Sequence, residues 1–545
     1  MSSSTLSYWQ LLFNQGAVTP SVIEYSYPGS GSEEDPYVIS WIPDDPRNPL
    51  LTPEWAKWAI TLLVSFAAMA VALVSSAYTG GLVEIIEFFE ISEIVALLGV
   101  TLFVIGFAIG PLFWAPLSEL YGRRLVYILS MMTLTVFTAG VAGAENTQTL
   151  LILRFFAGSL GSAAMAIPGG VIADIFPAVS RGLAGGVYAA APFLGPTLGP
   201  VIGGFIAESG GWRWVEGFLA IFSGVLLLAI VFLLPETYAP LLLKKRAENL
   251  RTITGRVYRT PLEVEETGKS ASGLKTLSTA FSRPWILLFR EPIVFLLSLY
   301  MAIIYGILYM LFAAYPIVFQ QTRGWSEGTG GLAFLGILIG ICLAVLSTFP
   351  LYFRYKKKAL KALSLGHGRL APEERLPDSF LGAIALPIGL FWFAWTNSPT
   401  IHWLAPIASG IPFGFGMVMV FIPIFNYLID AYTIFAASVI AANSLLRCLF
   451  GAIFPLFTNY MFQDLGIHWA SSVPAFLALA CTPLPFVFYW YGAWIRGHSR
   501  YAAEADAFME RLLGVGAGAG TGTGGVRKRG GEKEEEDEEL QALAQ

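Results

Sequence analysis

The sequence predicts an all-α membrane protein with twelve transmembrane helices arranged in two pseudo-symmetric six-helix bundles. Three observations indicate this fold class. The mean hydropathy is +0.64. Charged residues make up 13% of the chain, about half of the roughly 25% typical of soluble proteins. Apolar runs long enough to cross a bilayer recur along the whole chain. One globular core cannot bury so much apolar surface, so lipid must solvate part of it.

The order of these runs divides the chain into five parts. A spanning helix needs about 20 apolar residues to cross roughly 30 Å of hydrocarbon. Residues 1–54 are polar and are expected to form a mostly disordered cytoplasmic arm. Residues 55–234 form the first bundle, with spans near 58–78, 94–114, 125–144, 149–171, 185–206 and 214–234. After a cytoplasmic linker, 235–291, the second bundle covers 292–495, with spans near 293–317, 329–352, 379–396, 402–428, 432–457 and 468–492. A flexible cytoplasmic tail, 496–545, follows.

Loop charges predict the orientation of the chain. The linker holds ten basic residues and the loop after the eighth span holds seven, whereas the opposite loops hold only Arg213 and Arg323. Short cytoplasmic loops collect Lys and Arg, so both termini are expected in the cytoplasm.

A short charged turn separates the second and third spans. Residues 115–124 read Ala-Pro-Leu-Ser-Glu-Leu-Tyr-Gly-Arg-Arg. A turn of this kind between two spanning helices must lie at a water interface. We interpret it as a topology determinant and as part of a moving gate, with the candidate residues Glu119, Gly122, Arg123 and Arg124.

Two helices of the first bundle carry unusual residues. Arg154 shares one helix face with Gly158 and Gly161, which favours an arginine pointing into the bundle; a snorkelling arginine is the alternative. In the fifth span, three glycines and three prolines each recur every four residues. Close packing and function-linked bending of that helix are expected, with a plain packing seam as the alternative. The residues are Gly195, Gly199 and Gly203 with Pro192, Pro196 and Pro200.

The second bundle offers a further set of candidates for proton coupling or substrate binding. Asn443, Arg447 and Gly451 lie on one face of the eleventh span, where a structural hydrogen-bond network is as good an interpretation as a transport role. Asn426 and Asp430 close the tenth span, where a plain interfacial charge is the default. Tyr305 and Tyr309 are one turn apart on the seventh span and are candidates to line an apolar cavity.

Several function classes are excluded by the sequence. The net charge of −5 comes largely from the tail and suggests no nucleic-acid partner. The three cysteines have no metal-binding spacing. Thr267-Gly268-Lys269-Ser270 ends like a P-loop, but the required first glycine is Glu263, so nucleotide binding is rejected. We expect no cofactor, no metal, no enzymatic activity and a monomer.

These motifs resemble the major facilitator superfamily, and most closely its fungal drug:proton antiporter group with 12 spans. Ala115–Arg124 is similar to the family's loop motif, with Ala115 and Glu119 in place of its first Gly and its Asp. Arg154 with Gly158 resembles the span-four motif, whose arginine is implicated in proton coupling, and the stretch 195–204 resembles the antiporter motif of span five. Three further stretches resemble the fungal subgroup: residues 212–214, 235–240 and 426–430.

One departure from the family pattern bears on the substrate. Many relatives carry a glutamate in the seventh span just before Ala-Tyr-Pro, and here that position is Ala313. This departure argues against a polyamine substrate and favours a neutral or weakly acidic hydrophobic one. It also leaves the proton carrier unassigned.

The resemblance implies a proton-coupled exporter of small hydrophobic organic molecules, such as drugs, toxins or secondary metabolites, that works by alternating access between the two bundles. It implies the plasma membrane, with the vacuolar membrane as an alternative. Glu119 and Arg123 are expected to hold the cytoplasmic side shut, with Asp174 as a third partner. A polyamine exporter, an importer and a transporter-fold nutrient sensor are the alternatives.

Overall fold

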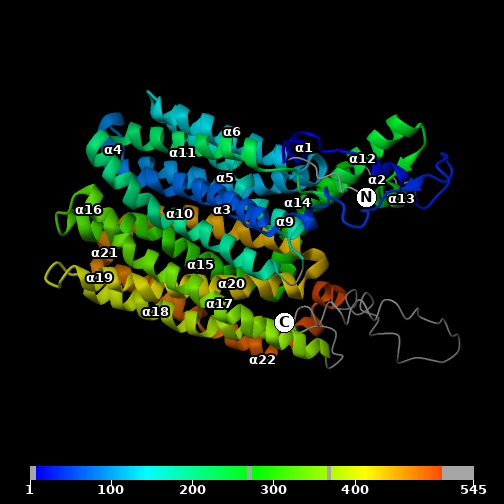
Figure 1. Cartoon of the computed structure of the whole chain (residues 1–545). Coiled ribbons are helices and arrows are strands. Elements are labelled where there is room, and N and C mark those ends of the chain that lie inside the picture. The colour runs from blue at the N-terminus through cyan, green and yellow to red at the C-terminus, as the bar shows by residue number, and fades with distance from the viewer. Residues whose placement is uncertain (1–7, 178–179, 267–272, 365–369, 506–545) are drawn as a thin grey trace.

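The computed structural model describes residues 8–177, 180–266, 273–364 and 370–505 (Figure 1). The P-loop-like stretch Thr267–Ser270 and most of the predicted tail lie outside the described residues. Within these ranges, eleven helical segments are long and apolar enough to cross a membrane. The last of them covers 66 residues, Thr433–His498, which is enough chain for two crossings.

The first bundle contains six spans, and helix breaks divide the first and fourth. α3 (Glu54–Ala77) is followed by a 3₁₀ turn (Tyr78–Gly81) and α4 (Leu82–Phe89). α5 (Glu93–Tyr121) and α6 (Arg123–Ala142) form the next two spans. The fourth is built from α7 (Thr147–Gly161), α8 (Ala163–Ala166) and α9 (Pro168–Ile175). α10 (Arg181–Gly210) and α11 (Trp212–Leu233) complete the bundle.

The second bundle repeats this arrangement after the linker helices α12 (Ala239–Thr254), α13 (Pro261–Glu266) and α14 (Gly273–Arg290). Its spans begin with α15 (Pro292–Tyr315), which a π-helical turn (Pro316–Gln321) extends. α16 (Glu327–Gly331), a 3₁₀ turn (Leu332–Phe334) and α17 (Leu335–Ser364) make the next span. A 3₁₀ turn (Pro372–Arg375) leads to α18 (Pro377–Thr396), and α19 (Leu404–Ala408) leads to α20 (Gly410–Ala431). After a 3₁₀ turn (Thr433–Phe435), α21 (Ala436–Cys481) and α22 (Pro483–His498) close the bundle.

One glycine shows why the last helical segment is two spans. Gly466, inside α21, has φ 72° and ψ 166°, which an L-residue with a side chain rarely adopts. Gly211, which joins α10 and α11, has nearly the same conformation, φ 86° and ψ 168°. The two turns occupy equivalent places between the fifth and sixth spans of their bundles. The chain therefore crosses twelve times, six in each half, as the sequence predicts.

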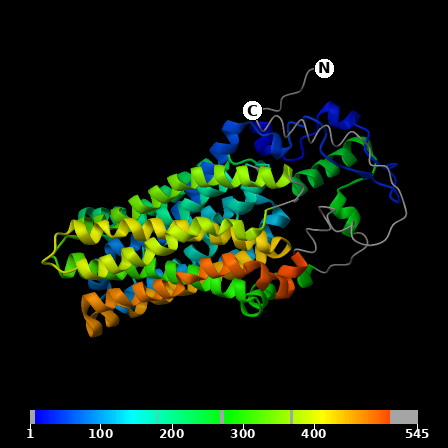
Figure 2. The ribbon, with the colours of Figure 1, turned by 90° about the horizontal axis from the view of Figure 1, so that it is seen from below.

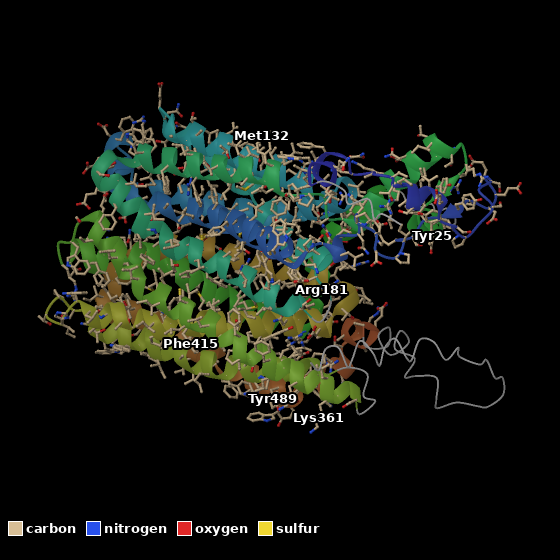
Figure 3. The ribbon with its side chains drawn as sticks, viewed as in Figure 1. Tyr25, Met132, Arg181, Lys361, Phe415 and Tyr489 are labelled. Atoms are coloured by element: carbon tan, nitrogen blue, oxygen red, sulfur yellow. The ribbon has the colours of Figure 1, made fainter. Side chains whose placement is uncertain are left out.

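Hydrophobic side chains are exposed on the outside of both bundles. Met132 lies on the outer face of α6 and is 42% exposed (Figure 3). Val136, Leu228 and Trp490 are 61%, 59% and 69% exposed. Such a surface is stable only in contact with lipid, because in water a large apolar area would be exposed to solvent. Charged residues such as Arg181 and Lys361 lie toward the end of the bundles near the linker (Figure 3).

The N-terminal arm differs from the expected disordered segment. Its described part contains α1 (Tyr8–Phe13), α2 (Pro20–Glu24), a 3₁₀ turn (Pro49–Leu51) and β1 (Tyr37–Val38), which pairs in parallel with β2 (Tyr258–Arg259) of the linker. A small second core joins the arm to α12; it consists of Val22, Tyr27, Ile39, Ile42, Ala247, Leu250 and Tyr258. The prediction of disorder is wrong for residues 8–54, because the arm obtains its apolar partners from a linker more than 190 residues away.

A buried ion pair fixes the arm to α12. Arg246 donates from both terminal nitrogens to Asp45, and its Nη2 lies 3.0 Å from Oδ1. The two side chains are 2% and 0% exposed. The arm and the linker lie at one end of the bundles (Figures 1 and 2).

Candidate functional site

Arg154 lies on α7 and points into the first bundle. The residue is 0% exposed. Nε donates to the Gly99 carbonyl at 3.1 Å, Nη1 to Val74 at 3.0 Å and Nη2 to Ser75 at 3.1 Å. The guanidinium also lies over the rings of Tyr78 and Phe103, 4.3 and 4.8 Å from their centroids. These contacts come from α3, α5 and the turn after α3, so Arg154 does not snorkel.

Glu216 is the acidic partner of Arg154. It lies in the first turns of α11, and its Oε1 accepts from Arg154 Nη1 at 3.1 Å. Both side chains are 1% exposed. The other carboxylate oxygen, Oε2, is buried and has no hydrogen-bond partner among the described residues. A buried ion pair with one oxygen unsatisfied is costly to maintain, and the free oxygen is a position where a proton can bind.

A different carboxylate organises the turn between α5 and α6. Glu236, just after α11, is 1% exposed. Its Oε1 accepts from the backbone N–H of Arg123 at 2.9 Å, and its Oε2 accepts from that of Arg124 at 3.2 Å. These are free N–H groups at the start of α6, where a negative charge is favourable. Gly122 has φ 91°, and a Cβ there would lie 2.3 Å from Glu236 Oε2, so this position requires glycine.

Arg123 pairs with Asp174, the expected third partner, and not with Glu119. Arg123 Nε donates to Asp174 Oδ2 at 3.2 Å, and Nη1 donates to Ser118 Oγ at 2.6 Å. Its guanidinium lies 4.8 Å from the centroid of the Tyr238 ring. Glu119 is one turn away on the exposed side of α5 and makes no ion pair with Arg123.

Arg124 binds the N-terminal arm. Its Nη1 donates to the Leu12 carbonyl at 2.6 Å and its Nη2 to Val231 at 3.0 Å. Arg47, also in the arm, donates to the Glu236 carbonyl at 3.4 Å. Burial lowers the pKa of Arg47 to about 10, and the charge of Glu236 opposes that shift. Burial likewise raises the pKa of Tyr238. The arm, α6 and the start of the linker therefore form one connected unit.

The glycines of α10 face α3, as the spacing predicts. A Cβ on Gly195 would lie 2.6 Å from the Met69 carbonyl oxygen, and one on Gly203 would lie 2.2 Å from that of Ala77. Gly199 faces Ser76 in the same way. α10 stays one continuous helix across Pro192, Pro196 and Pro200. The next face of α10 meets the second bundle, where Gly331 approaches the Pro200 carbonyl.

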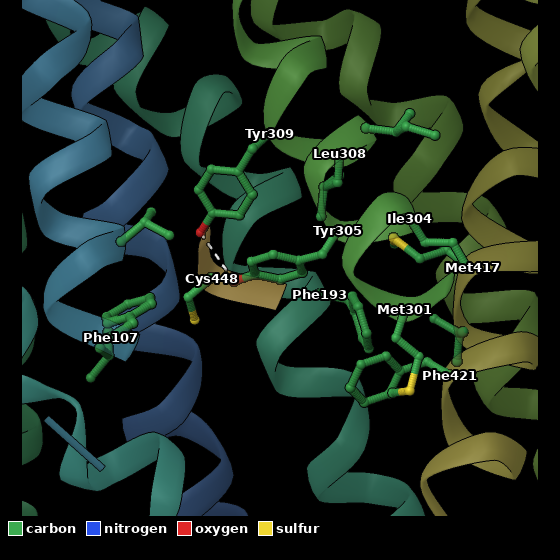
Figure 4. Packing of buried hydrophobic residues seen from close by; sticks show 14 of the residues in the cluster. Phe107, Phe193, Met301, Ile304, Tyr305, Leu308, Tyr309, Met417, Phe421 and Cys448 are labelled. Atoms are coloured by element: carbon green, nitrogen blue, oxygen red, sulfur yellow. Dashed lines mark hydrogen bonds between the residues drawn. The ribbon is translucent and has the colours of Figure 1, made fainter. Parts of the chain in front are cut away.

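The seventh and eleventh spans bring Tyr305, Tyr309, Asn443 and Arg447 together. The Tyr305 hydroxyl donates to that of Tyr309 at 3.3 Å (Figure 4). The Tyr309 hydroxyl lies 2.8 Å from Ser75 Oγ of the first bundle. Asn443 Nδ2 donates to Met301 Sδ at 3.2 Å. Arg447 lies over the Tyr305 ring. The predicted polar stripe of the eleventh span therefore faces the aromatic residues of the seventh.

Asp430 and Asn426 are not part of this group. Asp430 accepts from Arg375 Nε at 2.9 Å, and both residues are partly exposed. The pair lies at the end of α20, which agrees with an interfacial charge. Asn426 is half-buried one turn earlier on the same helix.

Comparison with known proteins decides the family. The sequence profile described as "Major Facilitator Superfamily" matches residues 64–455, which covers most of both bundles. The chain belongs to the major facilitator superfamily. It is a multi-pass membrane transporter of that fold, with twelve helices in two halves.

Fungal efflux pumps of the superfamily are similar to this chain. It is 60% identical to the "MFS-type efflux pump MFS2" of Trichophyton rubrum, over 93% of this chain and 84% of the relative. It is 57% identical to the "Major facilitator superfamily multidrug transporter mdrA" of Aspergillus fumigatus, over 93% and 82%. It is 52% identical to the "Efflux pump FUB11" of Gibberella moniliformis, over 91% and 82%.

Solved structures of the superfamily share the fold. The bacterial proton:xylose symporter XylE, bound to a sugar analogue, superposes with a TM-score of 0.56 and covers 80% of this chain and 95% of its own. The two sequences are 17% identical, so this likeness concerns the fold of the superfamily alone.

Sequence reasoning missed two carboxylates of this transporter, Glu216 and Glu236. Glu216 carried a usable signal, because it is an acidic residue inside an apolar run of membrane length. Glu236 lies in the stretch 235–240, which indicated only the family resemblance. Its role depends on the start of α6, more than 110 residues earlier.

Proposed function

We propose that this transporter is a proton-coupled efflux pump that exports small hydrophobic organic molecules by alternating access. The observation that carries the proposal is its extensive similarity to three fungal relatives named as efflux pumps or multidrug transporters. We further propose the plasma membrane as its location, both termini in the cytoplasm, and a monomer. The basic linker and the even number of crossings support this orientation.

In this proposal the Arg154–Glu216 pair carries the proton coupling. Arginine stays charged at all physiological pH values, so the proton must bind the carboxylate. The free Oε2 of Glu216 can accept it, which neutralises Glu216 and weakens its attraction to Arg154. Arg154 then retains only carbonyl and ring contacts from α3 and α5, and the packing of these helices against α7 can change.

The turn before α6 closes the cytoplasmic side in this proposal. Arg123 and Asp174 link α6 to α9, while Glu236 and the arm hold the start of α6. α10 contributes the sliding surface, since its glycine face on α3 and the next face on α16 allow close backbone approach.

Dye extrusion tests the coupling. Cells loaded with a neutral hydrophobic fluorescent dye should extrude it when they carry the wild-type protein, and a protonophore should stop the extrusion. Glu216→Gln and Arg154→Ala should each reduce the proton-dependent rate by about tenfold or more, the effect of about 1.4 kcal/mol. The matched control is Glu145→Gln, an exposed carboxylate of the same bundle. Wild-type rates in Glu216→Gln would exclude this residue as the proton carrier.

A further inference from the structure

Arg447 is a second arginine inside the membrane region, and none of the described acidic residues pairs with it. It lies eleven residues after the start of α21, about 17 Å along the helix axis at 1.5 Å per residue. None of the ion pairs of the described residues includes it. Its Nε is buried and has no hydrogen-bond partner in the described part of the chain, although the residue as a whole is half-buried. The polar groups that interact with it electrostatically are uncharged: the Cys448 thiol and the hydroxyls of Tyr188, Tyr305 and Tyr309.

Aromatic rings from two other helices surround the Arg447 guanidinium. Its central carbon is 4.9 Å from the ring centroid of Tyr305 and 5.1 Å from that of Phe421. Phe421 in turn packs edge-on against Phe193 of α10, with centroids 4.8 Å apart (Figure 4). Phe421 thus connects the site to the first bundle. Arg447 therefore lies beside the interface between the bundles and does not face lipid.

The helix face of Arg447 is shaped to hold these rings. Gly451, one turn further along α21, lies against Tyr305, and a Cβ there would come within 3.0 Å of that ring. Asn443, one turn earlier, is 1% exposed, and its Oδ1 is buried without a partner among the described residues. A donor and an acceptor, Arg447 Nε and Asn443 Oδ1, are therefore left unsatisfied one turn apart on the same face.

Arg447 and Arg154 differ in how their charge is compensated. Arg154 has a carboxylate, three carbonyls and two rings. Arg447 has two rings, and a cation over an aromatic ring is attracted only weakly compared with an ion pair. Removing an ion from water costs several kcal/mol, and a counter-charge is needed to offset it. The residues that the structure describes do not supply that counter-charge at Arg447.

We propose that Arg447 binds the anionic group of the exported molecule, and that the substrates are hydrophobic or aromatic carboxylates. This inference rests on the proposed efflux function. A guanidinium holds a carboxylate through two parallel hydrogen bonds. The rings of Tyr305 and Phe421 offer the apolar surface for the rest of the molecule. A cationic substrate such as a polyamine is repelled by the unpaired charge.

Binding of two isosteric probes tests this substrate class without any variant. The purified full-length protein in lipid nanodiscs is titrated at neutral pH with butylbenzoate, an aromatic carboxylate, and with butylbenzamide, its uncharged analogue. Hydrogen bonds between two charged groups are roughly twice as strong as those between neutral groups. We therefore expect the carboxylate to bind at least about tenfold more tightly than the amide, since about 1.4 kcal/mol is tenfold in affinity.

Two variants assign that preference to Arg447. Arg447→Gln should reduce the affinity for butylbenzoate about tenfold or more and bring it close to that for butylbenzamide. Arg354→Gln removes an exposed arginine of α17 and should leave the preference intact. Equal wild-type affinities, no binding of either probe, or an unchanged preference in Arg447→Gln would each overturn the proposal.

Proton-dependent extrusion of the neutral dye by the wild type is measured in parallel. If it persists while the preference is absent, the substrate class is wrong and the efflux function stands; if it fails, the proposed function itself is wrong.

Discussion

A single carboxylate, Glu236, holds the turn between α5 and α6 through backbone hydrogen bonds. Besides the N–H groups of Arg123 and Arg124, its Oε1 accepts from those of Thr237 and Tyr238 at 3.0 and 2.9 Å. Four backbone donors therefore depend on one side chain in a site that excludes water. Glu236 lies outside the motif of residues 115–124, yet it positions the two arginines of that motif, Arg123 and Arg124.

Replacement of Glu236 should destabilise this turn more than replacement of Glu119. Glu236→Ala leaves four N–H groups without their acceptor, and each buried unsatisfied group costs about 1–3 kcal/mol. We expect a melting temperature lower by several degrees in detergent and a loss of dye extrusion. Glu119→Ala changes an exposed carboxylate without an ion pair to Arg123 and should leave the melting temperature near that of the wild type. A larger decrease in melting temperature for Glu119→Ala than for Glu236→Ala would support the predicted Glu119–Arg123 contact instead.

Among the helices, α10 packs closely on both sides. Its glycine face lies on α3, and the face that carries Pro200 and Gly204 lies on α16 of the other bundle, where a Cβ on Gly204 would meet the Glu327 carbonyl oxygen at 2.5 Å. Small residues let helix backbones approach in this way. The four-residue repeat of the sequence therefore belongs to a helix that contacts both halves of the transporter.

Two glycines of α10 provide a matched test of this packing. A Cβ at Gly203 would lie 2.2 Å from the Ala77 carbonyl oxygen, whereas nothing lies within 4 Å of a Cβ at Gly185. Gly203→Ala should therefore destabilise the protein by about 1–3 kcal/mol. Gly185→Ala should be neutral or slightly stabilising, because alanine favours a helix over glycine by about 1 kcal/mol. Thermal unfolding in detergent measures both, and equal melting temperatures would contradict the close α3–α10 contact.

Individual elements show which parts of the fold and of the site could be predicted from the sequence alone. Apolar runs and loop charges depend on composition, so the spans and the two-bundle fold were predictable. The four-residue spacing placed Gly195, Gly199 and Gly203 correctly on one packing face. Asp174 was expected beside Arg123, and the two side chains do form an ion pair. Glu216 as the partner of Arg154 was not predictable, because the two residues approach through tertiary packing over 62 residues of sequence. The order of the arm was missed for the same reason, since its core is completed by α12.

Across the whole molecule, charged side chains stabilise both ends by binding free backbone groups. At the arm end, Glu236 binds the start of α6 within the first bundle. At the opposite end, Glu208 of α10 reaches across to the second bundle, where its Oε2 accepts from Gly328 N and Ser326 Oγ, both at 3.1 Å. Glu208 therefore joins the two bundles at the end that our proposal places outside the cell.

Glu208→Ala should open the external side of the transporter more often. It removes two hydrogen bonds to a charged group, each worth about 1.5–3 kcal/mol, and so should shift the population toward the outward-open state by about tenfold or more. Cys448 is a buried free cysteine beside the bundle interface, and it reports this opening in intact cells when Cys342 and Cys481 are replaced by alanine. A membrane-impermeant maleimide should label it about tenfold faster in Glu208→Ala. Ser209→Ala removes only hydrogen bonds within α10 and should label at the wild-type rate. Equal rates in all three proteins would mean that Glu208 does not hold the external side closed.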